Sequence, residues 1–496
     1  MNFIRSIRWV GGDRRPAPGL ARGFAGFGAA VWLAAGIAGC GVFGPRPAWE
    51  EPPPAPTVGP IVAAGDLHRS TLPNGIEILV LEDSRLPRVS LGLTLRRGDG
   101  SVAPAKAGVG ELAAEVMQRG AGDRDALALA KVIEDAGASL KVVAGWDATT
   151  VSLAGLSKDR GLLQDILADV TKRPRFEAAE FAKAQGEALA GLAAAVDDPM
   201  TLVRWHFLRT LYDGHRYGLP ESGSVATVKS LRVDDVRTYW KDRFVPRDAI
   251  FWAVGDVDAA TFAGEIEARY GQLPDVAPVA DTPAPPAETP AQRRIVVVDK
   301  PELVQAQILI GHEGIARSEP DRIAIDLMND ALGGSGFSSR LMKIVRGKNG
   351  LTYSVASGFA LRRQPGPFQI STFTKVESVR QVVDLVLAEM DAIRGPRPVD
   401  AEELAKFVSY SVGSFGLSLE TSRAMLASLV DLEVAGLPDD SLDTFRARVA
   451  GTKLVDVQAA AKTRLHPERA AIVVLGPADR LIPQLESLGK VEVVTP

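Results

Sequence analysis

The chain has 496 residues, of which 46% are hydrophobic and 24% are charged, and its formal net charge is −4. This length exceeds one ordinary domain, so we expect about two to four domains with ample core material. The small net charge, without a basic stripe that alternates with aromatic residues, excludes a nucleic-acid partner. A single cysteine excludes disulfides within the chain, and the five histidines are too widely spaced to share a metal site on one helix.

The first 40 residues have the pattern of an export signal. Five arginines precede an apolar run from Gly23 to Gly39, which is short for a membrane span. The run ends in Ile37-Ala-Gly-Cys40, which fits a bacterial lipoprotein box and predicts lipidation of Cys40. An anchor helix with an incidental cysteine is the alternative. Because Gly41 rather than Asp follows the cysteine, we expect a periplasm-facing protein that is anchored by lipid to a membrane, the outer membrane by default. Residues 1–40 are therefore a predicted signal peptide and residues 41–63 a Pro-rich tether.

Residues 64–275 have the pattern of an α/β unit. Alternating apolar residues predict strands, and longer amphipathic stretches predict helices. The predicted strands span residues 75–81, 89–95, 139–143 and 149–156, and the helices span 110–119, 125–136, 158–171, 178–196 and 202–211. Asp197-Asp198-Pro199 is expected to end the fourth of these helices.

A Pro-rich linker, residues 276–292, separates this unit from a second one, residues 293–496, which repeats it. Asp235, Pro246 and Gly255 in the first unit match Asp456, Pro467 and Gly476 in the second, with the same offsets of 11 and 9 residues. The sequence therefore predicts an α/β (α+β) fold with two homologous halves, each a mixed sheet packed by helices, enclosing a cleft.

One stretch of the second unit, Leu332 to Tyr353, concentrates hydrogen-bond donors. A Gly/Ser-rich loop leads into a short amphipathic segment with apolar Leu341, Ile344 and Val345. Arg346 and Tyr353 follow, seven residues apart across a Gly-Lys-Asn-Gly turn, and a strand is expected to begin at Tyr353. A guanidinium and a phenol on one open face are suited to holding carbonyl oxygens. The alternative is a surface arginine beside a tyrosine of the strand core.

Other candidate motifs fail on their context. Gly108-Val-Gly-Glu-Leu-Ala113 imitates a dinucleotide fingerprint, but the preceding residues do not read as a strand. His312-Glu313 is expected to be a turn after an apolar strand rather than a catalytic dyad, and His206 and His215 are expected to pack or cap a helix.

The two-unit layout and the Gly-Gly-x-x-Ser-Ser-Arg-Leu loop, with Arg346 and Tyr353 seven apart, resemble the pitrilysin/insulinase (processing-peptidase-like) family of zinc peptidases. The resemblance covers about residues 66–491 and implies two homologous halves that close around an unfolded peptide. In active members, a His-x-x-Glu-His helix binds zinc, its Glu is the general base, and a later Glu is the third ligand.

The zinc positions of this family are all changed here. Aligning Gly108 and Gly120 with the family pattern places the two histidine positions at Glu111 and Glu115 and the general-base position at Ala114. The Asp197-Asp198-Pro199 stretch places the third ligand at Gly191. Gly191 has no ligand atom and Ala114 cannot accept a proton, so the chain alone is expected to bind no zinc. Glu111 and Glu115, four residues apart on one helix, remain a possible site for a harder metal, against a solvated acidic face or a pairing with Arg.

Arg346 and Tyr353 match the pair that binds the substrate backbone in the family. The resemblance thus implies a substrate-binding, non-zinc subunit of a heterodimeric zinc metallopeptidase that acts on unfolded peptides in the periplasm. Its partner would be a homologous subunit that carries the zinc. A catalytically inactive peptide-binding or assembly scaffold of the cell envelope is the alternative from another class, and an autonomous metallopeptidase with a Glu-based site is a third.

Overall fold

The computed structural model describes residues 67–276 and 292–496, here called the first half and the second half, and both lie in one compact unit. The predicted signal peptide, Cys40 and the tether lie outside the described residues, as does nearly all of the predicted linker. Within the described residues, no helix combines the length and the apolar character that crossing a membrane requires.

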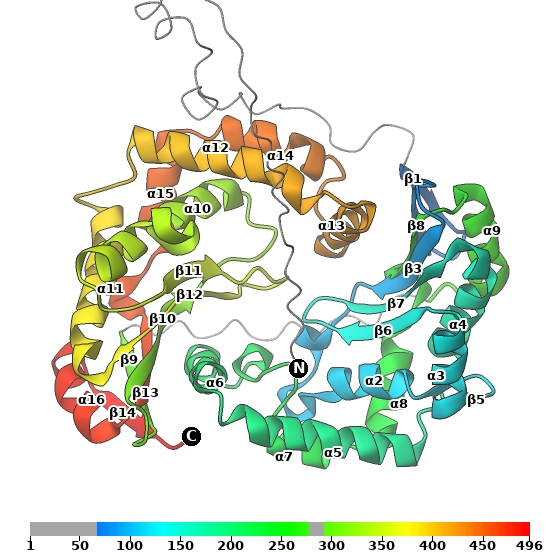
Figure 1. Cartoon of the computed structure of the whole chain (residues 1–496), viewed down its shortest axis with the longest axis horizontal. Coiled ribbons are helices and arrows are strands. Elements are labelled where there is room, and N and C mark those ends of the chain that lie inside the picture. The colour runs from blue at the N-terminus through cyan, green and yellow to red at the C-terminus, as the bar shows by residue number, and fades with distance from the viewer. Residues whose placement is uncertain (1–66, 277–291) are drawn as a thin grey trace, which may run out of the picture. The chain divides into compact units, whose positions relative to one another are not determined.

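The first half is built on a six-stranded mixed sheet (Figure 1). The pairs are antiparallel except for β2 and β8, which run parallel. In sheet order the strands are β1 (Leu67–Thr71), β2 (Glu77–Glu82), β8 (Ala249–Gly255), β3 (Arg88–Leu95), β7 (Thr149–Leu156) and β6 (Ser139–Ala144). A two-stranded ribbon adds β4 (Gly120–Ala121) and β5 (Arg124–Asp125).

The second half repeats this sheet. Its strands, in the corresponding order, are β14 (Val491–Val494), β9 (Arg294–Asp299), β13 (Ala471–Gly476), β10 (Gln305–Glu313), β12 (Pro367–Lys375) and β11 (Val355–Phe359). The only change of direction is at one edge, where β14 runs parallel to β9 whereas β1 runs antiparallel to β2. Gly255 and Gly476, which were matched by their offsets, end the equivalent strands β8 and β13. The predicted pair of homologous α/β halves is confirmed.

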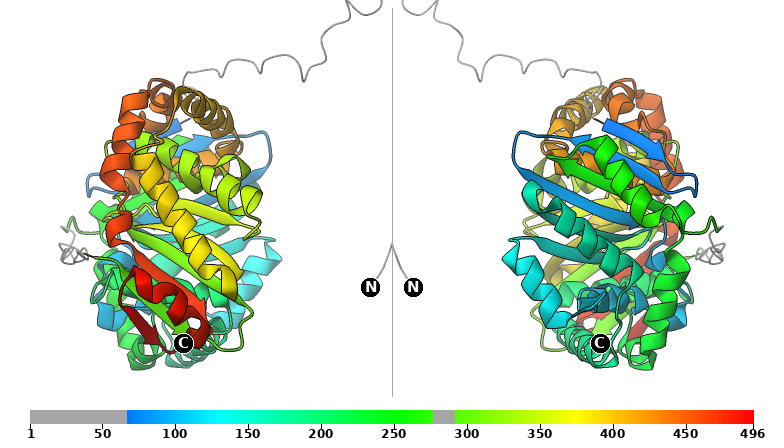
Figure 2. Two further views of the ribbon diagram at one scale, coloured as in Figure 1. Left: turned by 90° about the vertical axis from the view of Figure 1, so that its left-hand side faces the viewer. Right: turned by 90° about the vertical axis from the view of Figure 1, so that its right-hand side faces the viewer.

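Helices account for most of the remaining described chain. In the first half they are α2 (Val109–Met117), α3 (Ala126–Asp135), α4 (Arg160–Lys172), α5 (Ala178–Ala195), α6 (Pro199–Leu211), α7 (Val225–Ser230), α8 (Val233–Arg243) and α9 (Ala259–Tyr270). In the second half they are α10 (Arg322–Asn329), α11 (Val379–Arg394), α12 (Ala401–Ser418), α13 (Ser422–Ala435), α14 (Ser441–Ala450), α15 (Leu454–Arg464) and α16 (Ala478–Leu485). The two turned views of Figure 2 show helices in front of the strands of each half, among them α11 in yellow.

The break between α5 and α6 follows from local chemistry. The Asp198 carboxylate accepts hydrogen bonds from the backbone N–H groups of Met200 and Thr201, at 2.8 and 3.0 Å. Pro199 lacks an N–H and fits the first helical position. Asp198 and Pro199 therefore end one helix and begin the next, as the sequence predicted.

One helix of each half packs against the sheet of the other half. On α6, Val203 and Phe207 pack with Val473 of the second sheet in one buried cluster. In the reciprocal cluster, Leu426 and Val430 of α13 pack on Trp252 and other residues of the first sheet. Figure 1 shows α6 beside the strands of the second half. One face of each sheet is thus covered by a helix from the other half, so neither half buries its own sheet completely.

The turn between β11 and β12, residues 360–366, adds polar contacts between the halves. The Arg362 guanidinium lies 4.0 Å from the ring centroid of Trp146 and 4.3 Å from that of Tyr217. The next residue, Arg363, donates its backbone N–H to the Asp147 carboxylate at 2.9 Å. These buried cation–π contacts add to the attraction between the halves.

Local expectations need correction at two places. His312 is not a turn residue but lies inside β10, opposite Phe368, and is 2% exposed. The strand expected at Tyr353 begins two residues later, at Val355. Both errors concern strand ends, which depend on pairing with strands distant in the sequence and are the least reliable part of a prediction from local patterns.

Candidate functional site

The Arg346 side chain is presented by a single wide helical segment, the π-helix Met342–Lys348. The turn after the segment contains Gly350, whose φ of 63° is in the left-handed region that favours glycine. Arg346 donates from Nη1 to the carbonyl oxygen of Tyr353, at 3.1 Å. The chain therefore folds back so that the arginine and the tyrosine, seven residues apart, are neighbours.

Two aromatic rings flank the Arg346 guanidinium. Its central carbon lies 4.4 Å from the ring centroid of Tyr353 and 4.7 Å from that of Phe337. Both rings are open to solvent, since Tyr353 is 72% and Phe337 is 73% exposed. The alternative in which Tyr353 is a strand core residue is therefore wrong. Exposed aromatic rings around a cation form a surface that can contact a ligand through both apolar and charged groups.

The loop that carries Phe337 is held in place by its neighbours. Ser339 is fully buried and donates from Oγ to the carbonyl oxygen of Gly336 at 2.7 Å. Arg340 donates from Nε to Glu403 on α12 at 2.9 Å and from Nη2 to the carbonyl oxygen of Pro398 at 3.0 Å. These bonds tie the loop to the helical layer, so the exposed residues rest on a fixed support.

Phe337 was not singled out from the sequence. The sequence did show a large apolar residue within a run of Gly and Ser, and such a loop is not expected to bury its side chains. Sequence patterns alone do not tell which way such a loop residue faces, because the direction depends on the contacts of Ser339 and Arg340.

The degenerate metal positions of the first half lie on α2 and α5. Glu111 and Glu115 are exposed on α2, and Ala114 is buried between them at 6% exposure. Arg119 donates from Nη2 to Glu115 at 2.6 Å and also pairs with Glu187 of α5. These bonds raise the pKa of Arg119, the bond to Glu187 contributing most. Of the readings left open by the sequence, pairing with Arg is the one that the structure shows for Glu115.

Gly191 also lies on α5, on an exposed part of the helix. A Cβ added there would meet no atom within 4 Å. Within residues 67–276 and 292–496, no three His, Cys, Asp or Glu side chains are grouped as a metal site would require. Zinc needs three protein ligands, and an alanine, a glycine and an arginine-paired glutamate do not supply them. The residues present do not fit the zinc that the family resemblance implies.

Glu111 has an unusual electrostatic environment. Although part of the side chain reaches solvent, the surrounding protein removes enough water to raise its pKa, and the negative charges of Asp99 and Glu115 add to this effect. Asp99 itself is ion-paired with Arg216, and both side chains are only 1% exposed. A Cβ on Gly110 would lie 2.7 Å from Asp99 Oδ1. The glycine thus lets α2 approach this buried ion pair.

Sequence profiles and related proteins agree with this architecture. The profile of insulinase (peptidase family M16) matches residues 78–223, and that of the peptidase M16 inactive domain matches residues 230–409. A protein of Streptomyces coelicolor described as an uncharacterized zinc protease is 28% identical over 424 residues, which cover 83% of this chain and 90% of that protein. Another so described, from Bacillus subtilis, is 22% identical over 415 residues, which cover 84% and 99%.

Among solved structures, a peptidase M16 inactive domain from Pseudomonas fluorescens superposes with a TM-score of 0.74 at 25% identity. The superposition covers 83% of this chain and 98% of that one. The paired sheets, the Arg346–Tyr353 stretch and these matches lead to one conclusion. The chain belongs to the insulinase family, peptidase family M16.

Proposed function

We propose that this chain is the substrate-binding, non-zinc subunit of a heterodimeric zinc metallopeptidase that acts on unfolded peptides in the periplasm. The observation that carries the proposal is a contrast between the halves. Arg346, which is half-buried, contacts the exposed Tyr353, whereas Ala114 and Gly191 have no group that could bind zinc or accept a proton.

The chain's own contribution is binding and orientation. Guanidinium has five N–H donors, and one of those of Arg346 is used by the carbonyl of Tyr353. The remaining donors, together with the Tyr353 hydroxyl, hold a carbonyl oxygen of an extended peptide and stabilise negative charge that develops on it. Zinc on the homologous partner supplies an activated water. Lipidation of Cys40 keeps the subunit at the membrane surface, the outer membrane by default.

The test uses the purified chain alone and mixed with a homologous chain that carries His-x-x-Glu-His. Cleavage of an unfolded, fluorogenic peptide is expected only in the mixture. Arg346→Ala should lower cleavage by about a hundredfold, as expected for a donor to a developing oxyanion. Lys348→Ala removes an exposed cation from the same helical segment and should leave cleavage unchanged. Full activity with Arg346→Ala, or metal-dependent cleavage by the chain alone, would contradict the proposal.

A second candidate is a catalytically inactive peptide-binding or assembly scaffold of the cell envelope. The exposed aromatic pair beside Arg346 favours it, because such a surface binds peptides without any metal. Peptide binding that depends on Arg346, without cleavage in the presence of every homologous zinc-bearing chain of the same cell, would support the scaffold and overturn the peptidase subunit.

A further inference from the structure

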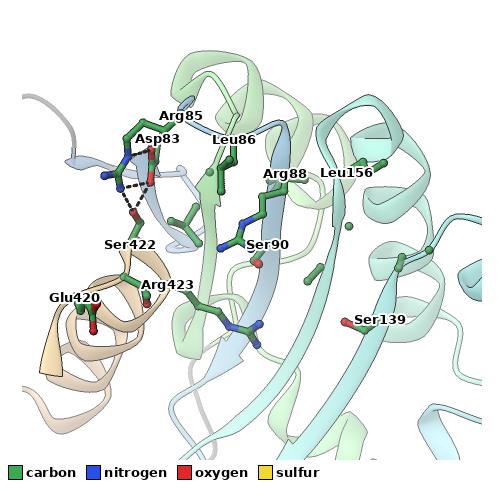
Figure 3. A pocket seen from close by; sticks show the side chains of 18 residues that line it. Asp83, Arg85, Leu86, Arg88, Ser90, Ser139, Leu156, Glu420, Ser422 and Arg423 are labelled. Atoms are coloured by element: carbon green, nitrogen blue, oxygen red, sulfur yellow. Dashed lines mark hydrogen bonds and ion pairs between the residues drawn. The ribbon is translucent and has the colours of Figure 1, made fainter. Parts of the chain in front are cut away.

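A cavity of about 690 Å³ lies between the first sheet and the beginning of α13 (Figure 3). The sheet contributes the start of β3, the end of β7, the end of β8 and the start of β6, which meet because neighbouring strands run antiparallel there. Its volume is within the range of roughly 300–1,000 Å³ that is typical of ligand sites. It is separate from Arg346 and from the degenerate zinc positions, none of which lines it.

Part of the charge in this cavity is already neutralised. Arg85 donates from Nε and Nη2 to the two carboxylate oxygens of Asp83, at 2.7 and 2.8 Å. Ser422, the first residue of α13, donates its hydroxyl to the same carboxylate. The hydrogen bonds from Arg85, and then that from Ser422, lower the pKa of Asp83, so it remains ionised. The charges and hydrogen-bonding groups of these three residues are therefore largely satisfied by one another, which leaves few of them to bind a ligand.

Two further arginines have no such partner. Arg88, at the start of β3, and Arg423, on α13, make no ion pair or side-chain hydrogen bond with any part of the chain that the structure describes. Figure 3 shows both side chains extending into the space between the sheet and α13. The cavity thus has two free guanidinium groups on opposite walls.

The net charge of the lining limits what can bind. Three arginines and two carboxylates line the cavity, so positive charge exceeds negative charge by one. A polyphosphate would remain mostly uncompensated here, whereas a single carboxylate matches the excess. Arginine also binds carboxylates through paired, charge-assisted hydrogen bonds, which are about twice as strong as neutral ones.

A second cavity, also about 690 Å³, adjoins the first, and Val254 and Arg423 line both. Part of its lining is apolar, with Trp252 on the sheet and Leu426, Val430 and Val434 on α13, and Asp147, Arg362 and Asp431 also line it. The indole N–H of Trp252 is satisfied by Thr94 Oγ1 at 3.1 Å, so the ring presents an apolar surface. A ligand that fills both cavities would have an apolar part next to one negative charge.

We infer that this pair of cavities binds the carboxylate of a peptide between Arg88 and Arg423, with the neighbouring apolar side chains of that peptide in the Trp252–Leu426 cavity. The inference deepens the proposed function and rests on it, since it takes the ligand to be a peptide. It adds a preference that the Arg346 site does not provide. Peptides with a free carboxylate after apolar residues are selected over the same peptides without it.

The experiment measures binding of one fluorescent apolar peptide in two forms, with a free C-terminal carboxylate and as the C-terminal amide. The full chain should bind the acid about tenfold more tightly than the amide, the size expected for a charge-assisted hydrogen-bonded pair. Arg88→Met with Arg423→Met should remove this preference, and Arg423→Lys should retain part of it because the charge remains. Lys229→Met, which removes an exposed cation outside both cavities, should leave the preference unchanged.

The outcomes separate this inference from the proposed function. Equal affinities for acid and amide, or a preference that survives the double variant, would overturn the carboxylate site while the effect of Arg346→Ala on cleavage still stands. Stronger competition by inorganic pyrophosphate than by the peptide acid would also overturn it. Loss of the acid preference in the double variant, together with no effect of Arg346→Ala on binding or cleavage, would support the cavity and contradict the proposed function. Thermal unfolding of each variant confirms that the fold is intact.

Discussion

Arg346 donates a hydrogen bond to the carbonyl oxygen of Tyr353 at 3.1 Å while its guanidinium lies 4.4 Å from the Tyr353 ring centroid. One arginine thus orders both the backbone and the side chain of the tyrosine just before β11. The contact leaves most of the guanidinium donors available, which is the condition for binding a second carbonyl group.

Phe337 completes this surface, and its removal should weaken peptide binding. The ring is 73% exposed, so Phe337→Ala loses ligand contact and a cation–π partner of Arg346 but little core packing. We expect affinity for an unfolded peptide to fall roughly threefold to tenfold, with the melting temperature unchanged. Titration calorimetry checks this, with Leu127→Ala, an equally exposed apolar residue of the first half, as the control. Unchanged affinity would remove Phe337 from the site.

Arg119 now links α2 to α5 at the former metal positions. It pairs with Glu115 and Glu187 and is 17% exposed, so Arg119→Met should lower the free energy of unfolding by about 1–2 kcal/mol. The effect should shrink in high salt because part of it is electrostatic. Lys131→Met is the matched control: its pair with Asp135 is 70% and 63% exposed, so about zero change is expected. Equal effects of the two variants in urea unfolding would show that the α2–α5 link contributes nothing.

Breaking the buried ion pair of Asp99 and Arg216 should lower the free energy of unfolding strongly. Both side chains are 1% exposed, and Asp99→Asn leaves the Arg216 charge without its counter-ion. We expect a loss of about 3–5 kcal/mol in the free energy of unfolding. Asp275→Asn breaks the exposed pair with Arg247 and should have an effect below about 1 kcal/mol. Denaturant titration measures both, and a small effect of Asp99→Asn would mean that water reaches the pair.

His312 should make stability depend on pH. Burial lowers its pKa from 6.5 to about 4, and its neutral ring accepts a hydrogen bond from the backbone N–H of His466 at 3.0 Å. Between these two pH values the unfolded chain binds more protons than the folded chain, so stability falls as pH drops from about 6.5 to 4. The upper limit of this contribution is about 3 kcal/mol.

The matching variant is His312→Gln, which keeps a hydrogen-bond acceptor but does not titrate in this range. Urea unfolding at several pH values should show a shallower slope below pH 6.5 than the natural chain shows. Some slope should remain, because burial also lowers the pKa of the neighbouring His466.

Much of the fold followed from local patterns. The predicted helices at residues 178–196 and 202–211 correspond to α5 (Ala178–Ala195) and α6 (Pro199–Leu211). Asp at the N-cap and Pro at the first helical position are both favoured at helix starts, so this boundary was readable from the sequence. The repeat was visible because Pro246 and Pro467 begin equivalent 3₁₀ turns, and Gly255 and Gly476 end the equivalent strands that follow. His312 was misjudged because its strand continues only by pairing with Phe368, more than fifty residues away.

The sequence by itself determined the two α/β halves, the loss of zinc ligands at Ala114 and Gly191, and the spacing that brings Arg346 to Tyr353, since each depends on residue identity or on short separations along the chain. Only the tertiary structure decided that Phe337 flanks Arg346, that α6 and α13 each cover the other half's sheet, and that Arg88 and Arg423 face one cavity. Arg88 and Arg423 are over three hundred residues apart, and no local preference encodes their meeting. They lie together because α13 buries Leu426 and Val430 on the first sheet, and that packing places the rest of the helix.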